Sequence, residues 1–247
     1  VLGDTDRGNG FGSAGSRSLF TGGSAVRVGA GEALDKARTL AASELEVSGA
    51  DLIYEAGAFV VKGTDLRRSL AQLASQQPNR RIEVDSKTAA KGPTWPNGCH
   101  VCEVEIDPQT GEIDVVDYTA VDDVGVMLNP AVIEGQIMGG VAQGLGQVLG
   151  ERLHYDSQGQ LLNASLMDYP VPRADTVPHM TIAHHSIPCT TNPLGVKGAG
   201  ESGVAGSLPA AVNAILHALS QAGVTTLDMP FTSQRVWSAL HLAHRSR

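Results

Sequence analysis

One short segment combines a carboxylate and an amine within a run of glycines. It extends from Asn192 to Gly203, and Lys197 and Glu201 are its charged side chains. Glycines let the backbone pass close to a ligand, and they leave the Glu201 carboxylate without bulky neighbours. A carboxylate in that setting suits a general base, which takes a proton from a reacting group. The structural alternative is that Glu201 caps or charges the start of the following helix, where free N–H groups favour negative charge.

The same segment matches a dinucleotide-binding pattern, Gly198-x-Gly200-x-x-Gly203. That pattern needs a buried strand just before it, and here only two apolar residues precede it, separated by another glycine. The Glu201 carboxylate would also repel a pyrophosphate bound on the loop. Nucleotide binding through Gly198–Gly203 is therefore a minor alternative.

Two clusters of cysteine and histidine raise the question of a metal. Cys99 and Cys102 lie three residues apart on a predicted strand, so they point to opposite faces. His184 and His185 are adjacent, and no second pair of cysteines exists. We interpret all of these as structural residues and predict no metal ligand among the side chains. Three cysteines favour a reducing compartment.

A second glycine-rich stretch covers residues 3–24, and Arg17 lies among its small residues. The composition is typical of a linker and also of a loop that approaches a ligand closely. Because a helical pattern follows directly, the sequence favours the ligand loop.

The elements that must position these segments alternate between helices and hairpins. No βαβ rhythm is present, so the sequence predicts an α+β fold, with possible lobes over residues 1–95 and 96–247. The expected helices cover 31–47 and 69–75 (capped by Ser69) and begin near Asn129, at Ser207 with Pro209 in the first turn, and after Pro230; the expected strands cover 51–54, 58–61, 100–106 and 113–121.

The composition describes a folded, acidic chain. The 247 residues are 42% hydrophobic and carry a net charge of −8. A nucleic-acid partner would need a basic face, so none is expected. No apolar run reaches about 18 residues, so no membrane-spanning helix is expected either. The start shows no signal-peptide pattern. Because the first residue is Val1 rather than Met, we interpret the sequence as cut from a longer chain.

Taken together, these segments resemble the molybdopterin-binding large subunit of the molybdenum hydroxylases, the family of xanthine oxidase, aldehyde oxidase and carbon monoxide dehydrogenase. The resemblance runs nearly end to end, and several ordered motifs are more specific than any one of them. The matching stretches are Gly3–Asp6, Gly15–Ser18, Asn97–His100, Glu103–Pro108, Gly135–Gly140, Ala142–Gly146, Leu166–Tyr169, Asn192–Glu201 and Asp228–Phe231.

The resemblance implies roles for individual residues and a fold. The chain would be the C-terminal, two-lobed part of the molybdenum-cofactor-binding domain, and Glu201 would be the general base of an oxidative hydroxylation that takes its oxygen from water. A cofactor close to the helix after Asn129 would also explain the glycines of that helix. The cofactor-binding residues would be Gly15, Ser16, Arg17, Ser18, Gln136, Lys197 and Gly200.

The resemblance also implies partners. The cofactor would be molybdenum–molybdopterin in its cytosine dinucleotide form. The upstream half of the same subunit would complete the site, and [2Fe–2S] clusters and FAD would lie on partner subunits or domains in a dimeric complex. The substrate would be a small molecule hydroxylated at an aldehyde or N-heterocycle carbon, and the location cytoplasmic, with the periplasm second. The fragment alone would be inactive. The alternative is a remnant or scaffold with the family fold and no metal.

Overall fold

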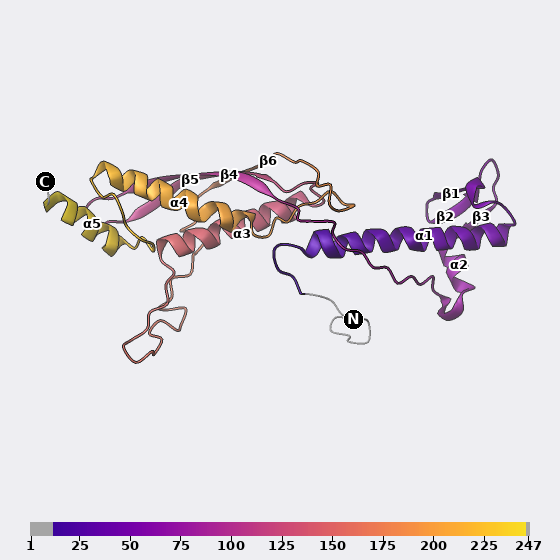
Figure 1. Ribbon diagram of the computed structural model, residues 1–247, viewed down its shortest axis with the longest axis horizontal. Helices are drawn as coiled ribbons and strands as arrows, with labels where there is room; N and C mark the ends of the chain where they lie inside the picture. Colours follow the sequence, from indigo (N-terminus) through magenta and orange to yellow (C-terminus); the bar gives the residue numbers. More distant parts are fainter. Residues whose placement is uncertain (1–11, 246–247) are drawn as a thin grey trace. The chain divides into compact units, whose positions relative to one another are not determined.

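The computed structural model describes residues 12–245, which divide into two units. The small unit comprises Ser18–Gly92 and Thr191–Leu194. The large unit comprises residues 12–17, Pro93–Thr190 and residues 195–245 (Figure 1). The motif Gly3–Asp6 lies outside the described residues.

The small unit packs a long helix against a three-stranded antiparallel sheet. The helix predicted over 31–47 is confirmed, but it begins earlier, because a π-helical turn (Leu19–Gly23) leads directly into it. Residues 18–24 were expected to be loop. Extending an existing helix is much easier than nucleating one, so these small residues continue it. The elements are α1 (Ser24–Leu45), β1 (Leu52–Glu55), β2 (Ala58–Val61), β3 (Arg67–Ser69) and α2 (Leu70–Ser75).

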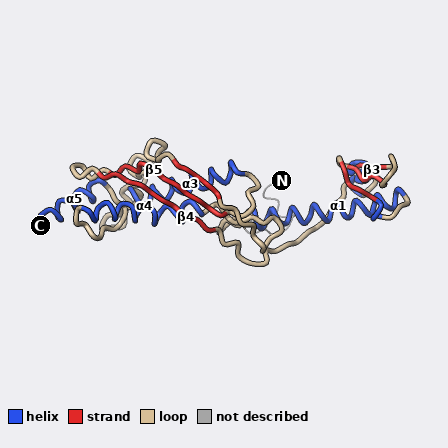
Figure 2. The backbone as a smooth tube through the Cα atoms, turned by 90° about the horizontal axis from the view of Figure 1, so that it is seen from above, coloured by secondary structure: helices blue, strands red, loops and turns tan. Residues whose placement is uncertain are grey.

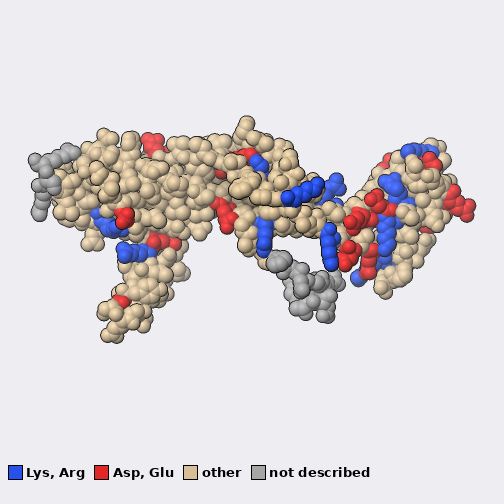
Figure 3. Space-filling model, viewed as in Figure 1, with Lys and Arg blue, Asp and Glu red and all other residues tan. Residues whose placement is uncertain are grey.

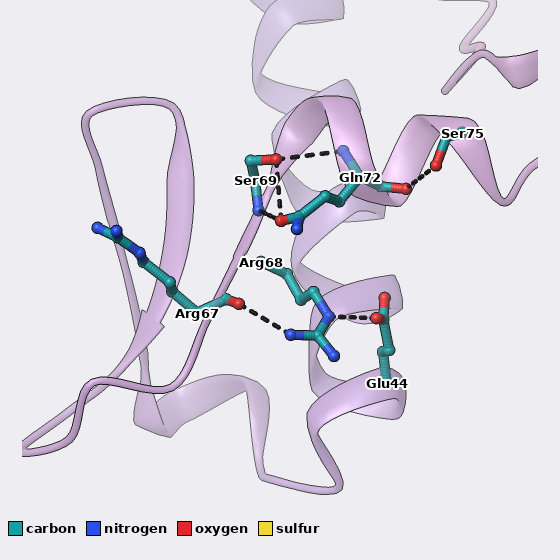
Figure 4. A network of polar contacts seen from close by, with 6 residues as sticks. All are labelled: Glu44, Arg67, Arg68, Ser69, Gln72 and Ser75. Carbon is teal, nitrogen blue, oxygen red and sulfur yellow. Dashed lines mark hydrogen bonds and ion pairs between the residues drawn. The ribbon is translucent and has the colours of Figure 1, made fainter.

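The start of α2 shows the predicted cap. The Ser69 hydroxyl accepts a hydrogen bond from the Gln72 N–H (3.2 Å), and the Gln72 side chain accepts one from the Ser69 N–H (2.9 Å). Beside this cap, the Arg68 guanidinium forms an ion pair with Glu44 of α1 (Figure 4). Side chains of both charges interleave over this unit on the face drawn in Figure 3, as on a solvated surface.

The large unit is a mixed three-stranded sheet with helices packed on its inner face (Figure 2). Strands β4 and β5 are antiparallel, and β5 and β6 are parallel. The hairpin was predicted, whereas β6 was not. The α+β class is confirmed. The elements are β4 (Asn97–Ile106), β5 (Ile113–Asp123), α3 (Pro130–Leu149), β6 (Met180–His184), α4 (Ser202–Gln221) and α5 (Ser233–Arg245).

Helix α4 begins at Ser202, so the start predicted at Ser207 is wrong. Ser207 is fully buried, and Pro209 lies inside the helix rather than in its first turn. A proline there removes one backbone hydrogen bond. Ser207 and Ala211 are nevertheless fully buried, and Ser207 lies directly against Gly144 of α3, so this part of the helix is held by packing.

Helix α4 is also long and apolar enough to cross a membrane, judged by length and composition alone. Its residues Ala211, Ile215 and Leu219 are buried in the core of the large unit. Core helices of globular domains pass the same test, so the expectation of no membrane-spanning helix stays a prediction.

Candidate active site

The glycine-rich loop 195–201 is fixed to the segment that follows β5. The Val126 N–H donates to the Gly195 carbonyl (2.9 Å), and the Lys197 N–H donates to the Val124 carbonyl (2.8 Å). Gly195 has φ +67°, a conformation that side chains disfavour. The loop therefore enters the site along a defined backbone path.

Glu201 ends this loop at the N-cap position of α4, yet its side chain makes no capping hydrogen bond. Instead its Oε2 accepts a hydrogen bond from the Ser16 hydroxyl at 2.9 Å. The carboxylate is exposed. The capping alternative therefore has no hydrogen bond to support it, and the carboxylate is held by a residue 185 positions earlier in the chain.

Three of the predicted cofactor-binding residues meet beside Glu201. A Cβ added to Gly200 would lie 3.3 Å from Ser16 Oγ and 3.5 Å from Gln136 Oε1. One added to Gly198 would lie only 2.8 Å from the Ser16 side chain. Gly15 and Ser16 both have positive φ, of +59° and +54°. The loop around Ser16 thus packs directly against the Glu201 loop, and glycine is what permits that approach.

The other predicted site residues lie in different surroundings. Arg17 donates through Nε and Nη2 to the carbonyl of Gly12, at 3.1 and 2.7 Å. Ser18 begins the small unit and precedes its first helical turn. Neither residue lines the cavity described below, so their contact with a cofactor stays a prediction.

Lys197 forms a buried ion pair. Its Nζ lies 2.5 Å from Asp123 Oδ2, and the two side chains are 10% and 9% exposed. Burial alone would raise the pKa of Asp123. Hydrogen bonds from Lys197 and from the N–H groups of Ile187 and Gly125 outweigh burial and hold that pKa below its ordinary value. The structure thus gives the Lys197 amine a partner within the protein, and a phosphate-binding role stays a prediction.

A cavity of about 440 Å³ opens beside Glu201. Its polar side chains come from the Ser16 loop, Thr94, the start of α4 and strands β4 and β5. It is lined by Gly15, Ser16, Thr94, Pro96, Asn97, Gly98, His100, Asp122, Gly198, Glu201, Ser202, Ala205 and Gly206.

A buried polar cluster in the wall of this cavity was missed from sequence. His100 Nδ1 lies 2.7 Å from Tyr118 Oη, and His100 Nε2 lies 3.4 Å from Asp122 Oδ2. Burial, with Cys102 and Asp122 nearby, raises the pKa of Tyr118 well above its ordinary value, so its hydroxyl stays neutral. The available signal was the alternation of β4, which turns His100 inward in the same row as Cys102 and Val104.

Cys99 and Cys102 point to opposite faces of their strand, as the sequence predicted. Cys99 is exposed and Cys102 is partly buried, on opposite faces of β4. Burial raises the pKa of the Cys102 thiol to about 11, so it is not a thiolate at neutral pH. Within residues 12–245, no group of three or more His, Cys, Asp and Glu side chains is arranged to hold a metal ion.

Two glycines of α3 lie at its contact with α4, whereas two others do not. A Cβ on Gly140 would lie 2.8 Å from the Val204 N–H, and one on Gly144 would overlap the Ser207 side chain. Both therefore permit the close crossing of α3 and α4, and the explanation through a cofactor is wrong for these two. Gly135 and Gly139 have open space where a side chain would lie.

The nucleotide pattern Gly198-x-Gly200-x-x-Gly203 is explained by packing. A Cβ on Gly203 would collide with the backbone of α3 at Ile137, and β6, the strand before the loop, already ends at His184. A larger cavity of about 1110 Å³ lies elsewhere in the large unit, between the β4–β5 turn, the end of α3 and residues 166–177. It contains none of the predicted site residues, so the smaller cavity is the candidate site.

Groups that can hydrogen-bond to a ligand converge beside Glu201. The backbone is free of side chains at Gly15 and Gly200, and hydroxyl and amide groups from Ser16 and Gln136 converge there. Such groups recognise a ring with several hydrogen-bonding atoms.

Comparisons with known proteins agree with this chemistry. A family model described as "Molybdopterin cofactor-binding domain" matches residues 1–178. The chain is 40% identical over 239 residues to the carbon monoxide dehydrogenase large chain of Hydrogenophaga pseudoflava, covering 94% of this chain and 30% of the relative. It is 37% identical over 238 residues to the nicotine 6-hydroxylase large subunit of Paenarthrobacter nicotinovorans, covering 92% and 29%.

Solved structures show the same relationship. Carbon monoxide dehydrogenase from Oligotropha carboxidovorans matches with a TM-score of 0.83 and 32% identity, over 97% of this chain and 31% of that one. Quinoline 2-oxidoreductase from Pseudomonas putida 86 matches with a TM-score of 0.78 and 32% identity, over 94% and 31%. The chain therefore spans about 30% of the length of these relatives.

Proposed function

The chain belongs to the molybdopterin cofactor-binding family, within the large subunits of the molybdenum hydroxylases, and on that basis we propose that it takes part in the oxidative hydroxylation of a small molecule. In this reaction R–H and water give R–OH, two protons and two electrons. The substrate carbon is that of an aldehyde or an N-heterocycle. Named relatives act on carbon monoxide and nicotine.

Glu201 is the general base in this proposal. The observation that supports this role is the placement of the Glu201 carboxylate. It makes no capping hydrogen bond to α4, it accepts a hydrogen bond from Ser16 at 2.9 Å, and it borders the cavity. A base must be fixed within hydrogen-bonding reach of the proton that it takes. The Ser16 hydroxyl fixes one carboxylate oxygen and leaves the other for the water that supplies the oxygen atom.

Ser16, Gln136 and Gly200 hold the pterin, and Gly15, Arg17, Ser18 and Lys197 complete its surroundings. When bound, a molybdenum–molybdopterin group supplies the two-electron oxidation. We expect the cytosine dinucleotide form. We expect [2Fe–2S] and FAD groups on partner subunits or domains of a dimeric complex to accept the electrons, and we expect that complex in the cytoplasm, with the periplasm second.

The first test is metal and pterin analysis of the purified native complex that contains this chain. We expect about one molybdenum per chain and a releasable pterin, as one cofactor site per large subunit requires. A fully assembled complex without molybdenum would favour the scaffold alternative and remove the catalytic role from Glu201.

The second test is Glu201→Gln in that complex. The amide keeps the size of the side chain and cannot accept the proton, so turnover should fall by at least about 10²-fold, while molybdenum content stays at the wild-type level. Glu103→Gln is the matched control, because Glu103 is an exposed carboxylate on β4 outside the cavity. Near-normal turnover in Glu201→Gln would refute the assigned role.

A further inference from the structure

The imidazole of His100 packs directly on the backbone of α4. A Cβ added to Gly206 would lie 2.5 Å from the His100 ring, so ring and helix touch where glycine leaves room. Gly206 follows Ser202 by four residues, which places both on the same face of the helix. Glu201 immediately precedes that turn. His100 therefore contacts α4 one turn after the helix start that carries the base.

The ring itself is fixed from β5. Tyr118 Oη lies 2.7 Å from Nδ1, and Asp122 Oδ2 lies 3.4 Å from Nε2. The imidazole and the Asp122 carboxylate are each 3% exposed, and Tyr118 is fully buried. The strand register explains the contacts, since His100 pairs with Ala120 and both partners lie two residues away on the same face. A ring that is hydrogen-bonded at Nδ1, lies close to a carboxylate at Nε2 and is surrounded by a packed interior has little freedom to shift.

A second glycine makes room for this cluster. A Cβ on Gly98 would collide with Asp122 Oδ1, so β4 leaves space beside the carboxylate. Asp122 Oδ2 and Ser202 Oγ have no hydrogen-bond partner within the described part of the chain. Both residues line the Glu201 cavity. The cluster is therefore joined to the candidate site rather than isolated in the core.

We propose that His100 is a positioning residue for Glu201: Tyr118 holds the imidazole through a hydrogen bond at Nδ1, Asp122 lies beside Nε2, and the imidazole supports the beginning of α4 at Gly206 against β4. This inference rests on the proposed role of Glu201 as the base. The contact with His100 sets the distance between the start of α4 and the sheet. It thereby sets the distance between the Glu201 carboxylate and Ser16. A displacement of about 1 Å in a catalytic group is enough to lower turnover by about 10²-fold.

The test uses His100→Ala in the native complex, with Val104→Ala as the matched control. Val104 lies on the same strand and the same inward face and packs against the core. Both variants remove a core-facing side chain, but Val104 does not line the cavity. A purely structural role for His100 predicts that the two variants behave alike once folded.

Two measurements separate the possibilities. In His100→Ala, hydrogen exchange in residues 198–206 should accelerate by about tenfold or more, as for a locally opened segment, while Val104→Ala leaves these residues at the wild-type rate. The kcat per molybdenum should fall by about tenfold or more with KM within about twofold. His100→Asn keeps a hydrogen-bonding atom near the position of Nδ1, so its exchange rate and its kcat should lie between those of His100→Ala and the wild type. Tyr118→Phe should show smaller changes in the exchange rate and in kcat than His100→Ala.

Unchanged exchange in residues 198–206 of His100→Ala would overturn the inference, and so would unchanged kcat per molybdenum. Should His100→Ala fail to fold, Tyr118→Phe decides alone, because it removes one hydroxyl from a buried ring. The exchange measurement does not depend on turnover, whereas Glu201→Gln tests the base. The support by His100 and the proposed function can therefore fail independently.

Discussion

Ser16 and Glu201 form the contact on which the candidate site depends at the residue scale. The hydroxyl donates to the carboxylate at 2.9 Å from a backbone with positive φ. Removing it in Ser16→Ala should lower kcat by about 2- to 10-fold, since the net worth of such a bond is about 0.5–1.5 kcal/mol. Steady-state kinetics per molybdenum would measure this.

The comparison variant is Ser16→Gly, which also lacks the hydroxyl but relaxes the positive φ. If the hydrogen bond is what matters, the two variants lose activity equally. A defect confined to Ser16→Ala would instead show that the backbone conformation is the important property.

Lys197 and Asp123 give a second prediction at this scale. Lys197→Met should lower the free energy of unfolding by about 3–5 kcal/mol, because it leaves a buried carboxylate without its counterion. Denaturant unfolding would measure it. The double variant with Asp123→Asn should recover most of that loss, and a double variant as unstable as the single one would contradict the ion-pair explanation.

The ion pair between Asp123 and Lys197 also makes the stability of the folded protein depend on pH. The pKa of Asp123 is lower in the folded protein than its ordinary value. The stabilisation is therefore complete above the unfolded pKa of about 3.9, and it is lost as the pH falls through the lower folded value. Melting temperatures measured below about pH 4 should fall less steeply in Asp123→Asn than in the wild type.

Helices α3 and α4 supply a prediction at the scale of elements. A methyl group at Gly140 would press on the backbone of α4, whereas one at Gly139 would meet open space. Gly140→Ala should thus lower stability by about 1–3 kcal/mol through overpacking. Gly139→Ala should raise it by about 0.5–1 kcal/mol, since alanine favours helix. Thermal unfolding of the two neighbours is the measurement, and equal effects would contradict the crossing contact.

Hydrophobic periodicity and turn residues were sufficient to predict most of the helices and strands. The hairpin from His100 to Val121, the cap at Ser69 and the Asn129 start of α3 were all predicted. The start of α4 was not, because Ser207 and Pro209 imitate a helix start and only packing against α3 reveals a helix interior.

The site was predicted unevenly, for a similar reason. The convergence of Ser16, Gln136 and Gly200 beside Glu201 agrees with the residues selected from the family motifs. The His100 cluster depends on strand register, which places Tyr118 and Asp122 beside the ring. Alternation gives the face of a residue but not its neighbour across the sheet, so the sequence could not show that pair.

At the scale of the whole chain, the described residues form two units. Each has its own core, one around Phe59 and Leu73 and the other around Tyr118 and Ile137. Phe59→Ala should destabilise the small unit by about 3–5 kcal/mol. Hydrogen exchange should accelerate in α1 and β1–β3 and stay unchanged in β4–β6. Faster exchange in both sheets would contradict the separation of the cores.

The order of the segments along the chain has a consequence for biosynthesis. Ser16 and Glu201 are 185 residues apart, and the small unit lies between them in sequence. At about 5–20 residues per second, a ribosome needs roughly 10–40 s to deliver Glu201 after Ser16 has emerged. The small unit has all of its helices and strands within Ser18–Gly92 and can collapse during that interval. The pocket beside Glu201 can therefore close only after the whole small unit between its two sides has been synthesised.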